Sequence, residues 1–229
     1  IAVIAILKLK AVELLAIAAI SDIKSSTKEN VAMTKLSEIL FNMGRIKEAN
    51  KSTYVDLIST CLAAHMHPKD HKGTPQDYLY EMGEKLFPIL KEEKLTNRID
   101  AFVEKSAFSP EQILPYYKKA KEMGFDLTVH ADQFSTSGSK IAVELAAVSA
   151  DHLEASTEDE ITLLAGSEVI PVALPAASLG IGCEFTPARR LLDAGASLAI
   201  ATDWNPGSAP MGKLIESASI LGAMQKLSN

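Results

Sequence analysis

The sequence predicts an α/β protein of the (β/α)8 or TIM barrel type. Short apolar stretches typical of buried strands alternate about seven times with amphipathic helical stretches. A doubly wound nucleotide-binding sheet is the alternative, but neither a G-x-G-x-x-G nor a Walker pattern follows an early strand. Polar residues instead follow the ends of many different strands, which is how a barrel builds a site. These residues are Lys24, His65, Glu104, His130, His152 and Asp203.

Composition is that of one globular domain spanning residues 1–229. The chain is 47% hydrophobic and 23% charged, and its formal net charge is −6. The basic residues are scattered, which argues against a nucleic-acid partner. Cys61 and Cys183 are too few for a disulfide framework and favour the reducing cytoplasm. The apolar start of the chain, 1–20, is interrupted by charged residues and indicates a buried helix and strand rather than a membrane segment.

The predicted elements follow from periodicity and from capping residues. Ser109, Pro110 and Gly124 mark the start and end of one helix. Thr157 and Glu160 form the capping-box pattern of another. The predicted helices are 9–16, 33–46, 77–91, 109–123, 140–148, 157–165 and 187–194, with a further apolar helical run near the end of the chain, and the predicted strands are 17–23, 54–64, 98–103, 125–130, 150–154, 169–174 and 197–202.

The strand 197–202 is read as a buried strand that delivers a carboxylate. It ends at Asp203, and the Asn-Pro-Gly that follows is typical of a tight turn. Since ligands collect at the carboxyl ends of barrel strands, Asp203 is a candidate site residue. The alternative from this segment alone is an Asp that starts a turn or caps a helix.

Three histidines follow the strand 54–64. His65 and His67 have a spacing that can chelate a metal from an extended chain. We favour a different interpretation, because Pro68 turns the chain outward and no acidic or apolar surroundings mark a metal site. His71 and His67 are therefore predicted to be solvated loop residues.

His130 and Asp203 end two other strands and offer a nitrogen and an oxygen donor. This pair suits a divalent metal such as zinc or iron(II). His152 could bind substrate or take a proton, and the adjacent Asp151 could orient it. The alternative for each histidine taken alone is a satisfied structural residue.

Several motifs in this order resemble the imidazolonepropionase family of the amidohydrolase superfamily, from about residue 10 to the end of the chain. They are Val-His-Ala-Asp-Gln-Phe at 129–134, Ser-Ala-Asp-His-Leu-Glu at 149–154, the helix 187–195, Ala-Ile-Ala-Thr-Asp-Trp-Asn-Pro-Gly-Ser at 199–208, and the segments 62–68 and 72–78.

The resemblance implies a metal-dependent hydrolase of histidine degradation. Its small-molecule substrate would be 4-imidazolone-5-propanoate, whose ring amide is opened to give N-formimidoyl-L-glutamate. It implies one divalent metal, zinc or iron, held by His130 and Asp203, with Asp203 also taking a proton from water. It further implies proton handling or substrate orientation by His152, and orientation of water or substrate by Gln133, which stands where many members have Glu. The implied substrate contacts are His65, Asn205, Gly207 and Ser208.

The chain also departs from the family pattern. This chain has no counterpart to four features of the family: the His-x-His metal ligands at the first barrel strand, a substrate-binding Arg, the last barrel strand and a small β-sandwich domain. In addition, Ser26-Thr27 replaces an expected tyrosine. We therefore expect an incomplete barrel, aggregation-prone unless completed by further residues or by a partner, as in a homodimer. The alternatives are an inactive barrel fragment, or another cyclic-amide hydrolase or deaminase of this superfamily.

Overall fold

The computed structural model describes residues 44, 46, 51, 58–210 and 212–227. The predicted elements at 9–16 and 17–23, together with Lys24, lie outside the described residues, as does 33–46 apart from Gly44 and Ile46, which are helical.

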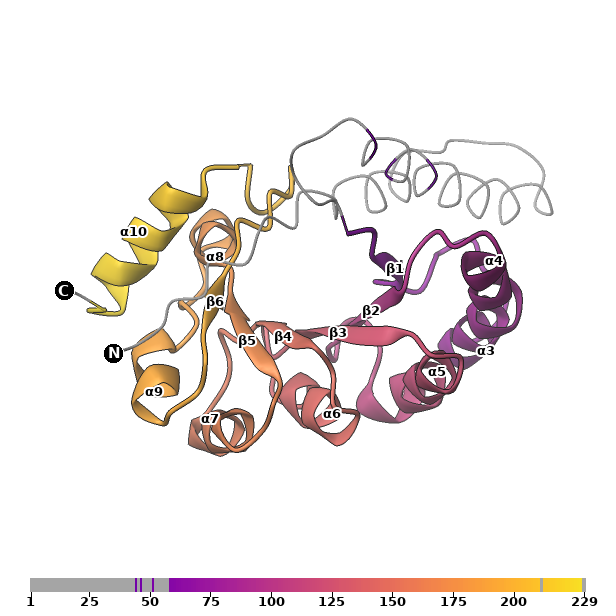
Figure 1. Ribbon diagram of the computed structural model, residues 1–229, viewed down its shortest axis with the longest axis horizontal. Coiled ribbons are helices and arrows are strands. Elements are labelled where there is room, and N and C mark those ends of the chain that lie inside the picture. The colour runs from indigo at the N-terminus through magenta and orange to yellow at the C-terminus, as the bar shows by residue number, and fades with distance from the viewer. Residues whose placement is uncertain (1–43, 45, 47–50, 52–57, 211, 228–229) are drawn as a thin grey trace.

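Six parallel strands form the sheet of the described part. They are β1 (Cys61–Ala64), β2 (Arg98–Val103), β3 (Asp126–Ala131), β4 (Ser149–His152), β5 (Ile170–Ala173) and β6 (Ala199–Ile200). Each strand pairs with the next in the order β1-β2-β3-β4-β5-β6. In a doubly wound sheet, the order of the strands would reverse at a switch point. The unbroken order is instead that of a barrel wall, and Figure 1 shows the strands curving in an arc.

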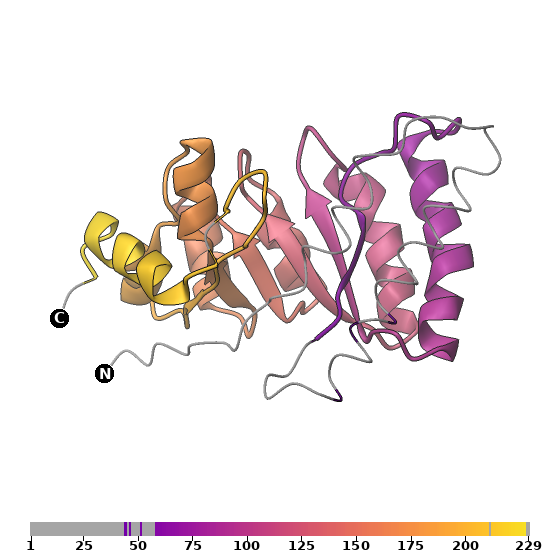
Figure 2. The same ribbon diagram turned by 90° about the horizontal axis from the view of Figure 1, so that it is seen from above.

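Helices cover the outer side of this arc. Figure 1 places α5, α6 and α7 along it, and Figure 2 shows the strands running in one direction beside them. The described helices are α3 (Pro75–Glu81), the π-helical turn η1 (Met82–Leu86), α4 (Phe87–Glu92), α5 (Pro110–Glu122), α6 (Gly138–Glu144), α7 (Glu158–Ala165), α8 (Pro175–Ile181), α9 (Ala188–Asp193) and α10 (Leu214–Met224).

Side chains alternate between the two faces of the sheet, and this alternation separates core from site. Ile99, Ala101 and Val103 of β2 belong to the apolar core that α5 helps to cover. The intervening positions face the barrel interior, where Phe102 pairs in register with His130, and His130 with Asp151. The interior thus becomes polar toward the carboxyl ends of the strands.

The predicted strand 98–103 and both predicted caps are confirmed. Ser109 starts α5 with a capping box to Gln112, and Thr157 and Glu160 form the predicted box at α7. Other bounds differ, since β1 begins at Cys61 within the described residues and the last strand has two residues. Helix α8 was missed because its seven residues are too short to show a helical period.

Tyr117 joins α5 to two strands through its hydroxyl. The ring is buried, and the hydroxyl donates to the carbonyl of Thr128 at 2.7 Å and lies 3.4 Å from that of Ala101. Tyr117→Phe should lower the free energy of unfolding by about 1–2 kcal/mol, because a buried hydrogen bond is lost. Denaturant titration measures this. The control is Tyr80→Phe at a 67% exposed ring, where a change under about 0.5 kcal/mol is expected. Equal effects in both variants would contradict the prediction.

The two cysteines are free thiols in different surroundings. Burial raises the pKa of the Cys61 thiol to about 12, so that its reactive thiolate is scarcer in the folded chain than in the unfolded chain at pH 8. Cys183 is partly exposed, although burial raises its pKa too. We expect one thiol to react with a disulfide reagent in the native chain and two after denaturation. Cys183→Ser should leave the native chain unreactive, and rapid labelling of that variant would show the prediction to be wrong.

Candidate functional site

A cavity of about 220 Å³ lies where the strands end, and it brings all eight of the predicted site residues together. They come from β3, from the last residue of β4, and from the segments that follow β1, β3 and β6. The lining residues are His65, His130, Gln133, His152, Asp203, Asn205, Gly207 and Ser208. Their individual roles stay predictions.

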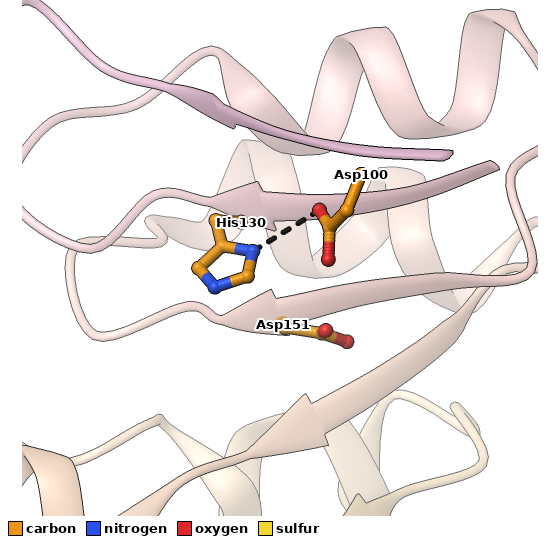
Figure 3. A group of neighbouring side chains, drawn as sticks. All are labelled: Asp100, His130 and Asp151. Carbon is orange, nitrogen blue, oxygen red and sulfur yellow. Dashed lines mark hydrogen bonds and ion pairs between the residues drawn. The ribbon is translucent and has the colours of Figure 1, made fainter. Parts of the chain in front are cut away.

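His130 is held at the end of β3 between two buried carboxylates. Its Nδ1 lies 3.1 Å from Oδ1 of Asp100. A carboxylate oxygen of Asp151 lies within 4.8 Å of a ring nitrogen of His130 and of a carboxylate oxygen of Asp100. Figure 3 shows the imidazole between Asp100 on one side and Asp151 on the other. Nδ1 of His130 thus faces a buried carboxylate, while the same side chain also lines the cavity.

His152 reaches the cavity through an unusual backbone. By register it pairs with Ala131, a core residue on the outer face. Its φ of 83° and that of Leu153, 71°, lie in the left-handed region, which breaks the strand alternation and turns the imidazole inward. Its Nδ1 lies 3.5 Å from Oε1 of Glu154, which also accepts a hydrogen bond from Ser178 at 2.8 Å. The carboxylate at this nitrogen is therefore that of Glu154, three residues beyond Asp151.

His65 is neutral at physiological pH. Burial, followed by the neighbouring charge of His130, lowers the pKa of His65 from 6.5 to about 4. Its ring stacks on Phe102 with centroids 5.5 Å apart and lies edge-on to His130 at 6.4 Å. A neutral imidazole held this way can donate one hydrogen bond and accept another from a ligand.

The turn after β6 holds Asp203 through its own residues. Oδ2 of Asp203 accepts from the Ser208 hydroxyl at 2.9 Å, and Oδ1 of Asn205 accepts from the Gly207 amide at 2.8 Å. Asp203 and Trp204 have φ values of 62° and 39°. Such left-handed residues cost energy and occur where the surrounding structure imposes them, often at functional sites.

The loop that carries Gln133 is fixed by two buried carboxylates. Asp132 accepts from the backbone amides of Ser137 and Ser139 at 2.9 and 3.2 Å. Glu104, at the end of β2, accepts from the amides of Phe134 and Ser135 at 3.0 Å each. The position of Gln133 beside the cavity thus depends on side chains from two strands.

The prediction that His67 and His71 are solvated is wrong. Both are partly buried, with Nε2 of His67 3.1 Å from Nδ1 of His71. Nε2 of His71 lies 3.3 Å from Oε2 of Glu81, and both rings meet Tyr78 edge-on. Helix α3 therefore shields this segment, which the local sequence could not indicate.

Sequence reasoning missed Asp100, the role of Glu154 and the anchoring by Asp132. The signal for Asp100 was present, because it is the one carboxylate inside the apolar strand 98–103. A carboxylate is rarely placed in such a strand unless it has a partner.

None of the helices within the described ranges has the length and apolar character needed to cross a membrane.

Curated relatives of this chain are imidazolonepropionases. One from Bdellovibrio bacteriovorus is 40% identical over 183 residues, which are 80% of this chain and 42% of the relative. One from Streptococcus pyogenes serotype M12 is 43% identical over 158 residues, 68% of this chain and 38% of the relative. The matched part of the chain is homologous to these proteins, and the chain spans about two fifths of their length.

Solved structures with a similar fold include hydrolases and deaminases by name. An adenosine deaminase from Xanthomonas campestris with bound zinc has a TM-score of 0.59 at 15% identity, over 89% of this chain and 52% of that one. A guanine deaminase from C. acetobutylicum with bound guanine has a TM-score of 0.62 at 12% identity, over 88% and 56%. They show the fold alone, a β/α barrel of which the six described strands form a part.

The N-terminal part of the chain has a different similarity. Residues 7–57 match the family model described as the SusR N-terminal TPR domain. This segment lies almost wholly outside the described residues and overlaps the region in which the resemblance to imidazolonepropionases was expected to begin. A single barrel domain over 1–229 stays a prediction.

Proposed function

We propose, from its homology to imidazolonepropionases, that this chain carries the substrate-facing part of a hydrolase that opens the ring amide of 4-imidazolone-5-propanoate to give N-formimidoyl-L-glutamate. The observation that carries the proposal is the single cavity lined by His65, His130, His152 and Asp203 together with the turn 205–208. The substrate is a small molecule, and the two free thiols suit the cytoplasm.

The cavity residues fit a divalent metal. His130 and Asp203 are both buried and line the same space, and they offer the nitrogen and oxygen donors that zinc or iron(II) prefers. His130 also contacts Asp100 through Nδ1, the kind of carboxylate contact that orients metal-binding histidines. When bound, the metal would supply a Lewis acid for polarising the ring carbonyl and acidifying water.

The remaining chemistry is assigned to the side chains of this chain. Asp203 takes a proton from the attacking water, whose oxygen bonds to the ring carbonyl carbon. The C–N bond then breaks, and His152 is placed to give a proton to the departing nitrogen. Gln133 orients water or substrate without transferring protons, because an amide does not titrate in this range.

Substrate binding is assigned to neutral groups around the cavity. His65 would donate one hydrogen bond to the substrate ring and accept another from it, since its pKa of about 4 keeps the imidazole uncharged. Asn205, Gly207 and Ser208 of the turn also line the cavity and offer amide and hydroxyl groups to the substrate. The arrangement suits a polar ring with a short polar side chain.

The test is to load the chain with zinc or iron(II), quantify the bound metal, and follow 4-imidazolone-5-propanoate by NMR. Stoichiometric metal and formation of N-formimidoyl-L-glutamate are expected. Stoichiometric metal without this product would indicate another reaction of the superfamily, to be sought among cyclic amides and aminopurines. Absence of both metal and turnover would favour an inactive barrel fragment. Either result would overturn the proposal.

A further inference from the structure

The orientation of the His130 ring is set from the strand beside it. Asp100 lies in the middle of β2, wholly buried, with Oδ1 at 3.1 Å from Nδ1 of His130. The imidazole is itself only 6% exposed. Figure 3 shows the carboxylate directed at this nitrogen from the neighbouring strand.

The register explains the contact. Asp100 pairs with Thr128, two residues before His130 on the same interior face of β3. The Asp100 carboxylate thus lies two residues nearer the amino ends of the strands than the His130 imidazole, and it approaches the ring from that side. His130 and Asp203 line the cavity at the strand ends, so the side of the ring that faces Asp100 is turned away from the ligand.

A neutral imidazole carries one N–H, and the partner of one nitrogen decides what the other can do. An ionised carboxylate at Nδ1 accepts a hydrogen bond and cannot donate one. In the neutral ring, this contact favours the hydrogen on Nδ1 and a lone pair on Nε2.

We propose that Asp100 is a positioning residue: it fixes the Nδ1–H tautomer and the ring plane of His130, so that Nε2 is presented to the cavity as a ligand atom. The metal that would use this atom rests on the proposed function, whereas the tautomer does not. Removing a carboxylate of this kind typically weakens metal binding by about 10–100-fold.

The first experiment reads the tautomer directly in metal-free protein. The chain is labelled with ¹⁵N-histidine, and two-bond ¹H–¹⁵N correlations are recorded near pH 8, with His130→Gln identifying the His130 signals. The wild-type chain should show the Nδ1–H pattern. Asp100→Asn should lose it in part or completely, because an amide can donate as well as accept.

Asp151→Asn is the matched control. It removes the same charge from the same cluster of three side chains. An effect of charge alone would appear in both variants, whereas positioning by Asp100 predicts that the tautomer changes only in Asp100→Asn. If Asp100→Asn does not fold, the wild-type pattern still decides, since an Nε2–H tautomer would overturn the proposal.

The second experiment measures metal affinity, by competition with a chromophoric chelator for zinc. Asp100→Asn should weaken zinc binding by about 10–100-fold, and Asp151→Asn by less. Equal affinity in Asp100→Asn and wild type would overturn the proposal, as would a zinc-dependent shift of Nδ1 in place of Nε2, which would mean that an ion binds within the cluster. A wild-type chain with the Nδ1–H tautomer but without zinc would refute the proposed function and leave the orientation by Asp100 supported.

Discussion

Asp203→Asn is expected to lower turnover of 4-imidazolone-5-propanoate at least about 100-fold, the lower end of what a general base contributes. Asparagine has the same shape and can still accept the hydrogen bond that Ser208 donates at 2.9 Å. The turn should therefore keep its conformation. What is lost is the negative charge and the capacity to take a proton, so kcat should fall along with zinc affinity.

The comparison requires a variant with the same change of charge outside the cavity. Asp126 is exposed at the start of β3, on the end of the sheet away from the site. Asp126→Asn should retain wild-type kcat and zinc content. Thermal unfolding of both variants would show that the fold is intact. Wild-type turnover in Asp203→Asn would refute the assignment of Asp203 as base.

The barrel wall could be predicted because its signals are local. The strand 98–103 alternates core and interior positions, and the capping boxes at Ser109 and Thr157 lie within four residues of each helix start. Such patterns are complete within a short window of sequence. The contact of Asp100 with the site was not predicted, because its pairing with His130 joins residues thirty positions apart through the register of two strands.

His152 shows a second limit. Strand periodicity would place it on the outer face with Ala131, against the core. Only the left-handed backbone at His152 and Leu153 brings it to the cavity. Left-handed φ values are uncommon for residues of this kind, and no local pattern predicts them. Its predicted place at a strand end, and then the resemblance to a known family, made His152 a candidate site residue, whereas its geometry required the structure.

The turn that carries Asp203 also depends on a residue far away in sequence. Gly180, near the end of α8, packs against the backbone of Ser208: a Cβ at this position would overlap the Ser208 carbonyl oxygen and lie 2.9 Å from its carbonyl carbon. Backbone atoms cannot rotate away as a side chain can. A methyl group here must displace either the helix or the turn.

Gly180→Ala is therefore expected to lower the free energy of unfolding by about 1–3 kcal/mol, the usual cost of overpacking. It should also raise KM, because Ser208 and its neighbours move relative to the cavity. Urea denaturation and steady-state kinetics measure the two effects. Gly222→Ala is the matched control, since it lies in α10 with no atom within 4 Å of the added Cβ. That variant should be as stable as wild type or more stable by up to about 1 kcal/mol, because alanine favours helix. If Gly180→Ala were equally harmless, the turn would have room to move, and the close packing of α8 could not be what holds Ser208 against Asp203.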